Sequence, residues 1–572
     1  MADATSHFNP QVWRRRLRIA QGEEPADLVL AGGSVINVLS GEIYAADIAI
    51  ADGVIAGVGA YPLAIERIDV SGKWVAPSFI DAHVHTESAL VWVPEFARTV
   101  VPHGTGAIVS DPHELANVAG LPALEALRAA ARGLPLGVFL TVPSCVPASR
   151  WESAGASFGP VEIAQMLAWP ETVALGELMS YPAVLAGDDA IAAKLAASAG
   201  HLRDGHAPGV SGGALQAYVG SGVFSDHEST ALDEAREKLR AGQMVMIREA
   251  SSAHNLEALL PLVTDATYPR CCFCADDRDS HTLLHDGHMD AIVRLAIARG
   301  LDPVRAIRLA TWNAADYWRL AGWGAIAPGY RANLIVLDDL REVRVGMTIF
   351  AGNVVAREGE CLTGVIPDRA EIPVELRDTM HVAPVSREDL RLTPEAGHRA
   401  VGAIPGEIAT RLARVEPAVR DGWAVAAPER DLLKIVCVER HRATGRVGVG
   451  YVQGFGLQRG AIASSIAHDA HNIVAIGADD DDLLVAIAAV TASGGGLAAV
   501  ADGQILAHLA LPVAGILSDQ PLADVAAAYG TLEDAARSLG STLPSPFGLL
   551  AFMALSVIPE ARVTDHGFIE VG

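Results

Sequence analysis

His83 and His85 stand two residues apart at the end of an apolar run, in the stretch FIDAHVHTESALV. On a β-strand, residues i and i+2 point to the same face, so the two imidazoles would project together from a strand end. Two imidazoles on one side make half of a metal site. Two ordinary histidines would fit this stretch as well, so the other polar residues of the chain decide between the interpretations.

Other apolar stretches also end in histidines or carboxylates. These residues are, in chain order, Asp111, His113, Glu114, Glu177, His206, His227, Asp276 and Asp277. A strand would point Asp277 away from Asp276, which favours Asp276 as the site residue. Four of these histidines and two of the carboxylates suit a hard-to-borderline divalent cation, or two such cations bridged by one carboxylate: His83, His85, His206, His227, Glu177 and Asp276. Water bound to such a cation ionises near neutral pH, which predicts a hydrolytic centre.

Three polar stretches allow both a structural and a functional interpretation. In DPHELANVAG, Asp111 either caps the helix that Pro112 opens or joins the site with His113 and Glu114. In AHDAHN, His468 and His471 either line the site entrance or pack between domains. The acidic run of GADDDDLLVAIAAV favours the start of a helix, where its dipole stabilises negative charge.

The elements that must position these residues alternate between strands and helices. The predicted strands are 78–83, 105–111, 137–142, 172–178, 243–249 and 270–276, with two weaker ones near 204–209 and 222–228. Eight strands within roughly 250 residues predict a (β/α)8 barrel over 78–322, in which chemistry sits at the carboxyl ends of the strands. A doubly wound sheet is the structural alternative.

The chain of 572 residues is too long for one hydrophobic core, and its pattern of predicted strands and helices differs between segments. Residues 25–77 and 323–365 are β-rich segments with Gly and Asp-Gly turns, which predicts one small sheet domain built from both flanks of the barrel. Residues 1–24 predict a helical extension, and 366–572 a C-terminal α/β domain.

The composition of the chain limits which kinds of partner it could bind and where in the cell it could work. A formal net charge of −25 argues against nucleic acid or an anionic membrane as a partner, because phosphate binding needs a basic surface. No apolar run reaches the roughly 18 residues of a membrane-spanning helix, and the N-terminus has no apolar core of a signal peptide. Three of the six cysteines stand in RCCFCADD without metal-pair spacing, which favours reduced core thiols of a cytoplasmic protein.

The order of these residues resembles the amidohydrolase superfamily: HxH on the first strand, a carboxylate on the fourth, single histidines on the fifth and sixth, and an aspartate on the eighth. Longer motifs resemble one family within it, the bacterial adenine deaminases. They are PSFIDAHVHTES, GTGAIVSDPHELANVAG, VPSCVPAS, GELM, GHAPGVSG, SDHEST, ADDR, WGAIAPGYRANLIVLDD, SSIAHDAHNIVAIGADDDDLLVAIAAV and LALPVAGILSD. Most relatives in the superfamily carry a carboxylated lysine on strand four, where this chain has Glu177. Thr86 and Ala89 also depart from the Ile-Glu-Ser-Ser that usually follows HVH in the family.

The resemblance implies an α/β fold, with a metal-dependent (β/α)8 TIM barrel, a small flanking β-sandwich and a further C-terminal domain. It implies hydrolytic deamination of adenine by water to hypoxanthine and ammonia, as in purine salvage, at a binuclear centre of Mn²⁺ or Fe²⁺. The implied metal ligands are His83, His85, Glu177, His206, His227 and Asp276, of which Glu177 and Asp276 also carry protons. The candidate purine contacts are Glu87, Ser88, Asp111, His113, Glu114 and Asn117. We expect a homodimer or higher homo-oligomer.

Two other functions remain open at this point. One is a different cyclic-amide or nucleobase amidohydrolase, such as a hydantoinase or dihydroorotase, although these usually carry the strand-four lysine. The other is a non-catalytic scaffold on the same fold, although such proteins typically lose metal ligands and this chain keeps all six candidates.

Overall fold

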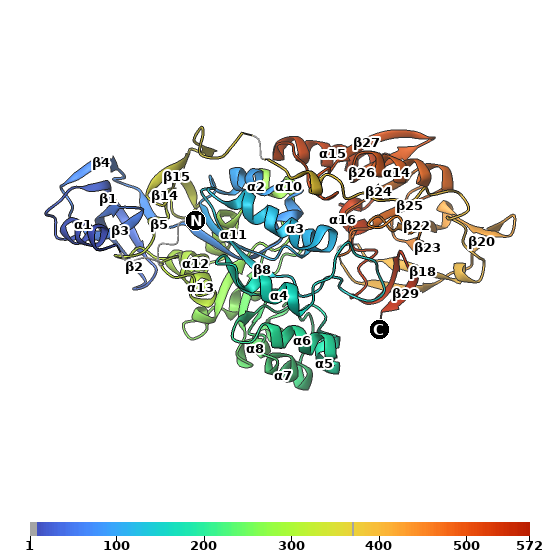
Figure 1. The fold of residues 1–572 in the computed structure, drawn as a ribbon, viewed down its shortest axis with the longest axis horizontal. Coiled ribbons are helices and arrows are strands. Elements are labelled where there is room, and N and C mark those ends of the chain that lie inside the picture. The colour runs from blue at the N-terminus through green and yellow to red at the C-terminus, as the bar shows by residue number, and fades with distance from the viewer. Residues whose placement is uncertain (1–8, 369–370, 406, 572) are drawn as a thin grey trace.

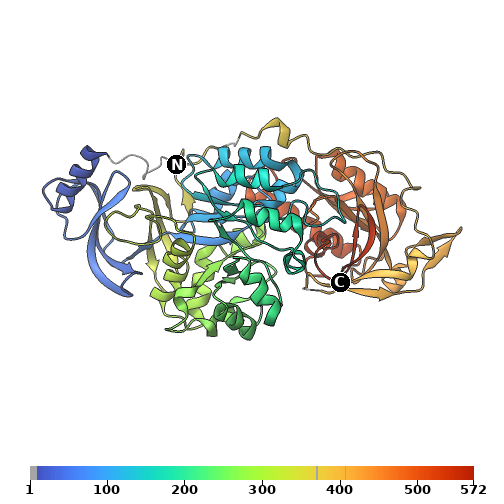
Figure 2. The ribbon, with the colours of Figure 1, turned by 60° about the horizontal axis from the view of Figure 1, so that its bottom comes forward.

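The computed structural model describes residues 9–368, 371–405 and 407–571. Two views show three units in a row: a small β-domain at one end, an α/β barrel in the centre, and a second α/β unit at the other end (Figures 1 and 2). The chain crosses from the β-domain into the barrel and returns before it enters the C-terminal unit.

Eight parallel strands form the barrel in two arcs. The first arc runs β6-β7-β8-β9-β10 and the second runs β11-β12-β13. Their bounds are β6 (Phe79–Val84), β7 (Thr105–Ser110), β8 (Gly137–Val142), β9 (Thr172–Leu175), β10 (Leu202–Arg203), β11 (Ser225–Asp226), β12 (Met244–Arg248) and β13 (Cys271–Cys274). A parallel bridge between Val84 and Asp276 joins the two arcs. The eight predicted strands are confirmed, and the two weak ones are the two-residue strands β10 and β11.

Helices follow the strands and cover the outside of the barrel. The main ones are α2 (Val93–Val100), α3 (His113–Ala131), α4 (Pro160–Leu167), α5 (Tyr181–Ala186), α6 (Asp189–Ala197), α7 (Gly212–Gly220), α8 (Leu232–Arg240), α9 (Leu256–Leu259), α10 (Ser280–His285), α11 (Met289–Ala298), α12 (Pro303–Leu309) and α13 (Trp312–Tyr317). The strands β6, β7, β12 and β13 are buried along their whole length, and they are mainly apolar up to the polar residues at or just beyond their carboxyl ends. This arrangement gathers the candidate residues at one mouth of the barrel.

The small β-domain is a nine-stranded sheet built from both flanks of the barrel. Its strands are β1 (Ala26–Asn37), β2 (Glu42–Ala51), β3 (Val54–Gly59), β4 (Ala64–Asp69), β5 (Trp74–Pro77), β14 (Leu334–Asp339), β15 (Arg344–Phe350), β16 (Asn353–Arg357) and β17 (Glu360–Cys361). The antiparallel pair β5–β14 joins the two flanks. The helix α1 (Pro10–Ala20) packs on β3 and begins at Asn9, whose side chain accepts from the backbone of Gln11 and Val12.

The C-terminal unit is built on a second sheet, in the order β19-β18-β23-β22-β25-β24-β26-β27. Its strands are β18 (Arg399–Ala403), β19 (Thr410–Arg414), β22 (Leu433–Val438), β23 (Val447–Gln453), β24 (Ala461–Ser464), β25 (Ile473–Gly477), β26 (Gly496–Ala501) and β27 (Gln504–Ala510), with hairpins β20 (Ala418–Arg420)–β21 (Trp423–Val425) and β28 (Glu560–Thr564)–β29 (Gly567–Val571). Its helices are α14 (Asp480–Ala492), α15 (Leu522–Ser538) and α16 (Pro546–Ala551). Asp479 caps α14, so the acidic run opens a helix as predicted.

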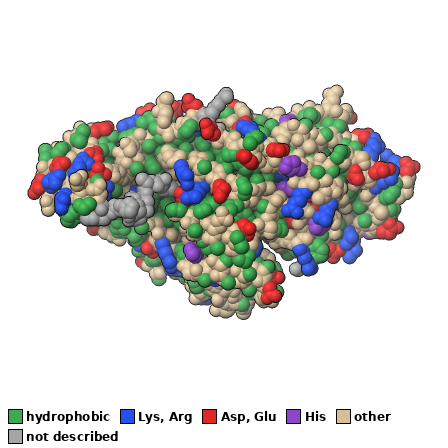
Figure 3. Space-filling view, in the orientation of Figure 1, with side chains coloured by type: hydrophobic (Ala, Val, Ile, Leu, Met, Phe, Trp, Pro, Cys, Tyr) green, Lys and Arg blue, Asp and Glu red, His purple; other side chains and the backbone are tan. Residues whose placement is uncertain are grey.

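The C-terminal unit contacts the barrel through backbone as well as side chains. Ser518 N donates to Leu90 O at 2.7 Å, and Trp92 N donates to Ser518 O at 3.3 Å, in the loop between β6 and α2. The helix α15 also packs against α10. Figure 3 shows acidic and basic side chains interspersed over one face of the molecule. None of the helices in the described ranges combines the length and apolarity needed to span a membrane.

Candidate metal centre

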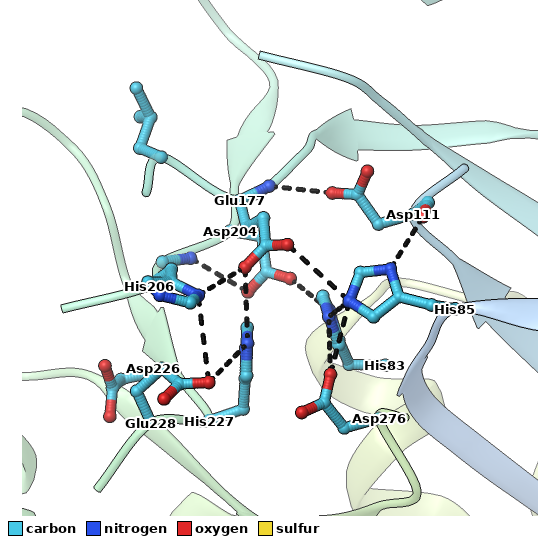
Figure 4. A network of polar contacts seen from close by, with 12 residues as sticks. His83, His85, Asp111, Glu177, Asp204, His206, Asp226, His227, Glu228 and Asp276 are labelled. Carbon is cyan, nitrogen blue, oxygen red and sulfur yellow. Dashed lines mark hydrogen bonds and ion pairs between the residues drawn. The ribbon is translucent and has the colours of Figure 1, made fainter. Parts of the chain in front are cut away.

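His83 and His85 lie on and just beyond β6 and point into the barrel mouth (Figure 4). His83 Nδ1 donates to Asp204 Oδ2 at 2.7 Å, and His85 Nδ1 donates to the carbonyl of Asp111 at 2.9 Å. In each neutral ring the remaining Nε2 therefore carries a lone pair. The two Nε2 atoms face one another at 3.1 Å.

Glu177, two residues beyond β9, lies between two groups of histidines (Figure 4). Its Oε2 is 2.7 Å from His206 Nδ1 and 3.3 Å from His227 Nε2, and its Oε1 is 3.6 Å from His85 Nε2. Burial would raise the pKa of Glu177, but His206 and His227 beside it hold that pKa well below its usual range. Glu177 is thus a buried carboxylate whose Oε2 faces His206 and His227 and whose Oε1 faces His85.

Asp276 follows β13 with a backbone φ of 54°, in the left-handed region that Asp tolerates better than most residues. Its Oδ1 lies 3.2 Å from His85 Nε2, and its Oδ2 accepts from Arg248 Nη1 at 2.8 Å. Burial would raise the pKa of Asp276, but the guanidinium of Arg248 beside it holds that pKa well below its usual range. Because the strand ends at Cys274, strand alternation does not place Asp277.

The donor set fits divalent cations. Two lone pairs that face each other in a buried site repel unless a cation lies between them, and the Nε2 atoms of His83 and His85 are in that position. Groups with mutually close ligand atoms include His83–His85–Asp276, His83–Glu177–His227, His85–His113–Glu177 and His206–His227–Glu228, and all their members are buried except the partly exposed His206. Imidazole and carboxylate together suit zinc, manganese and iron.

Asp111 and His113 stand at the edge of this centre. Asp111 does not cap α3; its Oδ2 accepts from the backbone N–H of Glu177 at 2.9 Å and so fixes that residue. His113 Nδ1 lies 3.5 Å from Asp111 Oδ1 and 3.4 Å from Glu177 Oε1, and its Nε2 lies 3.4 Å from Glu114 Oε1. Glu114 in turn pairs with His468 and His471 of the C-terminal unit.

The remaining candidate purine contacts lie around the same mouth. Ser88 Oγ donates to Asp277 Oδ1. Glu87 Oε1 accepts from the backbone N–H of Leu115 at 3.3 Å, and burial raises the pKa of Glu87 to about 7. The Asn117 amide is turned into its own helix, where it donates to the carbonyl of His113 at 3.0 Å.

Three buried residues of the site were not predicted from the sequence: Asp204, Glu228 and Arg248. Asp204 orients His83, while Glu228 Oε1 lies 3.5 Å from His227 Nε2. Arg248 reaches across from β12 and pairs with both Glu228 and Asp276. Asp204 precedes His206 by two residues and Glu228 follows His227 directly, so closeness to a predicted ligand was the available signal.

Two family models match the chain. The model described as "Amidohydrolase family" matches residues 74–355, which hold the barrel and part of the β-domain. The model described as "Adenine deaminase C-terminal domain" matches residues 407–572. The two matches together cover the barrel mouth and the C-terminal histidines that contact it.

Curated relatives match over nearly the whole length. An adenine deaminase of Dehalococcoides mccartyi (strain ATCC BAA-2266 / KCTC 15142 / 195) is 46% identical over 97% of this chain and 97% of its own. An adenine deaminase of Oleidesulfovibrio alaskensis is 43% identical over 96% of both chains. Among solved structures, an adenosine deaminase from Xanthomonas campestris with bound zinc aligns with 59% of this chain and 95% of that chain, at 15% identity and a TM-score of 0.44. The full-length similarity, together with the C-terminal match, shows that this chain belongs to the adenine deaminase family.

Proposed function

We propose that the protein is an adenine deaminase, which hydrolyses the exocyclic C–N bond of adenine to give hypoxanthine and ammonia. The observation that carries the proposal is the position of Glu177, whose two oxygens face two buried histidine groups at the mouth of a barrel that belongs to this family. The full-length similarity to curated adenine deaminases supports the choice of adenine over other cyclic amidines.

Six side chains would hold two divalent cations, for which we propose Mn²⁺ or Fe²⁺. His83, His85 and Asp276 form one group, His206 and His227 form the other, and Glu177 stands between them. Such a pair supplies a Lewis acid and lowers the pKa of bound water.

The residues of the chain must then move two protons. Adenine has a weakly electrophilic ring and a poor leaving group, so a ring nitrogen and the departing amine both need protonation. Glu177 is ionised beside its histidines and is placed to take the proton of the attacking water at Oε1 or Oε2 and pass it to N1 of the purine. Asp276 has Oδ1 free of Arg248 and is placed to take the second proton from the hydroxyl that water adds to the ring carbon and to pass it to the exocyclic nitrogen, which then leaves as ammonia.

The purine would lie among the polar residues that ring the mouth. Glu87, Ser88, Asp111, His113, Glu114 and Asn117 are the proposed contacts or supports. Two of these act through other groups in the structure: Asp111 accepts from the backbone of Glu177, and Asn117 donates to the backbone of His113. Glu87 and Ser88 stand nearest to His85 in sequence and are the stronger candidates for direct contact.

We also propose the setting in which the enzyme works. The chain divides into an N-terminal extension (1–24), the β-domain (25–77 with 323–365), the barrel (78–322) and the C-terminal domain (366–572). The protein acts on a small molecule in the cytoplasm. It works as a homodimer or a higher homo-oligomer. The shared sheet of β5 and β14 supports the pairing of the two flanks. The acidic net charge supports the absence of nucleic acid as a partner.

The proposal is tested by incubating Mn²⁺- or Fe²⁺-loaded protein with adenine and measuring ammonia and hypoxanthine. We expect equimolar formation of both products. Hydrolysis of hydantoin or dihydroorotate without adenine turnover would instead support a different cyclic-amide hydrolase.

A further inference from the structure

Two histidines of the C-terminal unit meet a carboxylate of the barrel beside the metal centre. His468 Nδ1 and His471 Nε2 each contact one carboxylate oxygen of Glu114, which stands at the start of α3. Glu114 and His471 are buried, and His468 is nearly so. This contact joins parts of the chain that are more than 350 residues apart in sequence.

Glu114, His468 and His471 have ligand atoms close enough to hold a cation. The hydrogen bonds of His471 indicate instead that the two histidines hold the Glu114 carboxylate directly. The backbone N–H of Ala467 donates to His471 Nδ1 at 3.3 Å, so the proton of the neutral ring is on Nε2, facing Glu114. A metal-bound histidine would show the reverse pattern, with its second nitrogen donating to an acceptor. In its neutral form, His471 therefore presents its Nε2–H to the Glu114 oxygen that it contacts.

The segment that carries these histidines is firmly held. His471 has a φ of 56°, in the left-handed region that disfavours residues other than glycine. Its carbonyl accepts from the buried Arg440, and the carbonyl of Ala470 accepts from His441 Nε2 at 2.7 Å. His468 stacks on Phe552 with ring centroids 4.6 Å apart and an interplanar angle of 12°. A backbone held in an unfavourable conformation by several neighbours indicates that the position of the side chain matters.

Glu114 is connected to the metal centre through His113. Glu114 Oε1 lies 3.4 Å from His113 Nε2, and His113 Nδ1 on the other side of the ring lies 3.4 Å from Glu177 Oε1. The chain of contacts runs from His468 and His471 through Glu114 and His113 to the carboxylate that stands between the two histidine groups.

We propose that the C-terminal unit is a working part of the active site, in which His468 and His471 are positioning residues that fix Glu114 and, through it, His113 against Glu177. The kinetic part of this inference rests on the proposed adenine deaminase activity. It gives the C-terminal unit a role in catalysis that neither its sheet nor its helices would otherwise indicate.

The test uses removal and retention of the N–H donors in the metal-loaded, full-length protein. His471→Ala removes the donor, whereas His471→Gln keeps an N–H close to the position of Nε2; His468→Ala and His468→Asn form the matching pair for Nδ1. Supporting groups around metal sites typically contribute about 10–100-fold to activity or metal affinity. We expect the Ala variants to lower kcat by a factor in that range, with a smaller change in KM, and the Gln and Asn variants to recover most of it.

The control must break the same interface without touching this chain of contacts. His566 also spans the junction, since its Nε2 lies 3.3 Å from Ser153 Oγ, and it is partly exposed. His566→Ala should leave kcat close to that of the wild type. If His566→Ala and His471→Ala reduce kcat equally, the histidines act only by holding the units together and the proposal fails.

A double-mutant cycle tests the route through Glu114. If His471 acts through Glu114, the Glu114→Gln/His471→Ala double variant loses no more kcat than Glu114→Gln alone. Losses that multiply would overturn this route. Should the wild type fail to turn over adenine, the proposed function falls, and the rate of Mn²⁺ loss to a chelator decides the inference. Faster loss from His471→Ala than from His566→Ala supports it, and equal rates overturn it.

Discussion

Glu177 turns its two carboxylate oxygens toward different histidines: Oε2 lies 2.7 Å from His206 Nδ1, and Oε1 lies 3.6 Å from His85 Nε2. The backbone N–H of Glu177 is itself held by Asp111. A carboxylate fixed in this way can serve two cations at once, where many amidohydrolases use a carboxylated lysine.

Replacing His83 and His85 together with Ala should remove metal and activity, while the barrel stays folded. The two Nε2 atoms converge at 3.1 Å, so the double replacement removes two candidate ligands from the same side of the centre. Metal content by elemental analysis and helicity by circular dichroism check the result. His254→Ala is the control, because its side chain is 66% exposed and contacts Glu249. Stoichiometric metal and normal turnover in the double variant would place the site elsewhere.

Asp276→Asn separates ligation from proton transfer. The amide keeps one oxygen donor but cannot carry a proton near neutral pH, and general acid–base groups contribute about 10²–10⁴ in rate. We therefore expect turnover to fall by at least roughly 10² with metal still saturating. Steady-state kinetics over a metal titration measures this.

Asp277→Asn is the matched control for Asp276. The sequence predicted that strand alternation turns Asp277 away, but β13 ends at Cys274 and Asp277 instead accepts from Ser88. We still expect the smaller effect at Asp277, because it lacks the contacts to His85 and Arg248. A larger loss of turnover in Asp277→Asn than in Asp276→Asn would mean that Asp277 carries the proton.

Arg248→Met should destabilise the fold, because it leaves the buried carboxylate of Glu228 without its cationic partner and removes a donor from Asp276. Removing one partner from a buried ion pair costs about 3–5 kcal/mol. The exposed pair of Arg236 and Asp233 offers a comparison, and Arg236→Met should change the unfolding free energy by less than about 1 kcal/mol. Chemical denaturation of the metal-loaded variants measures both, and similar losses in the two would contradict the assignment.

Glu152→Gln should stabilise the protein increasingly as pH rises. Burial, reinforced by nearby Asp469, holds the pKa of Glu152 well above its usual range. A raised pKa in the folded state means that its contribution to stability is present below the unfolded pKa and is lost as pH rises toward the folded one. The difference in melting temperature between the variant and the wild type should therefore grow from pH 5 to pH 9. A difference that shrinks over this range would show that Glu152 is ionised and well accommodated.

The barrel could be predicted from the sequence because its strands are apolar on both faces and end in polar residues. HxH spacing placed His83 and His85 together, and the order of the later ligands followed from chain order in a barrel. Asp204 and Arg248 could not be found in this way, because neither a lone Asp just after β10 nor a lone Arg at the end of β12 carries a periodic signal. The contact of Glu114 with His468 and His471 depends on how the C-terminal unit docks, which no local pattern specifies.

Free adenine should be a much better substrate than adenosine. This expectation comes from the family alone. Initial rates for adenine, adenosine and substituted adenines measure it, and comparable kcat/KM for the nucleoside would contradict it.

The most direct test of the account is adenine deamination by the wild type after metal removal and reloading with Mn²⁺ or Fe²⁺, with ammonia, hypoxanthine and bound metal measured on the same sample. The account predicts that the metal-free protein is inactive, and that activity rises in proportion to metal up to two ions per chain. Full activity without metal, or two bound ions without any conversion of adenine to hypoxanthine, would contradict it.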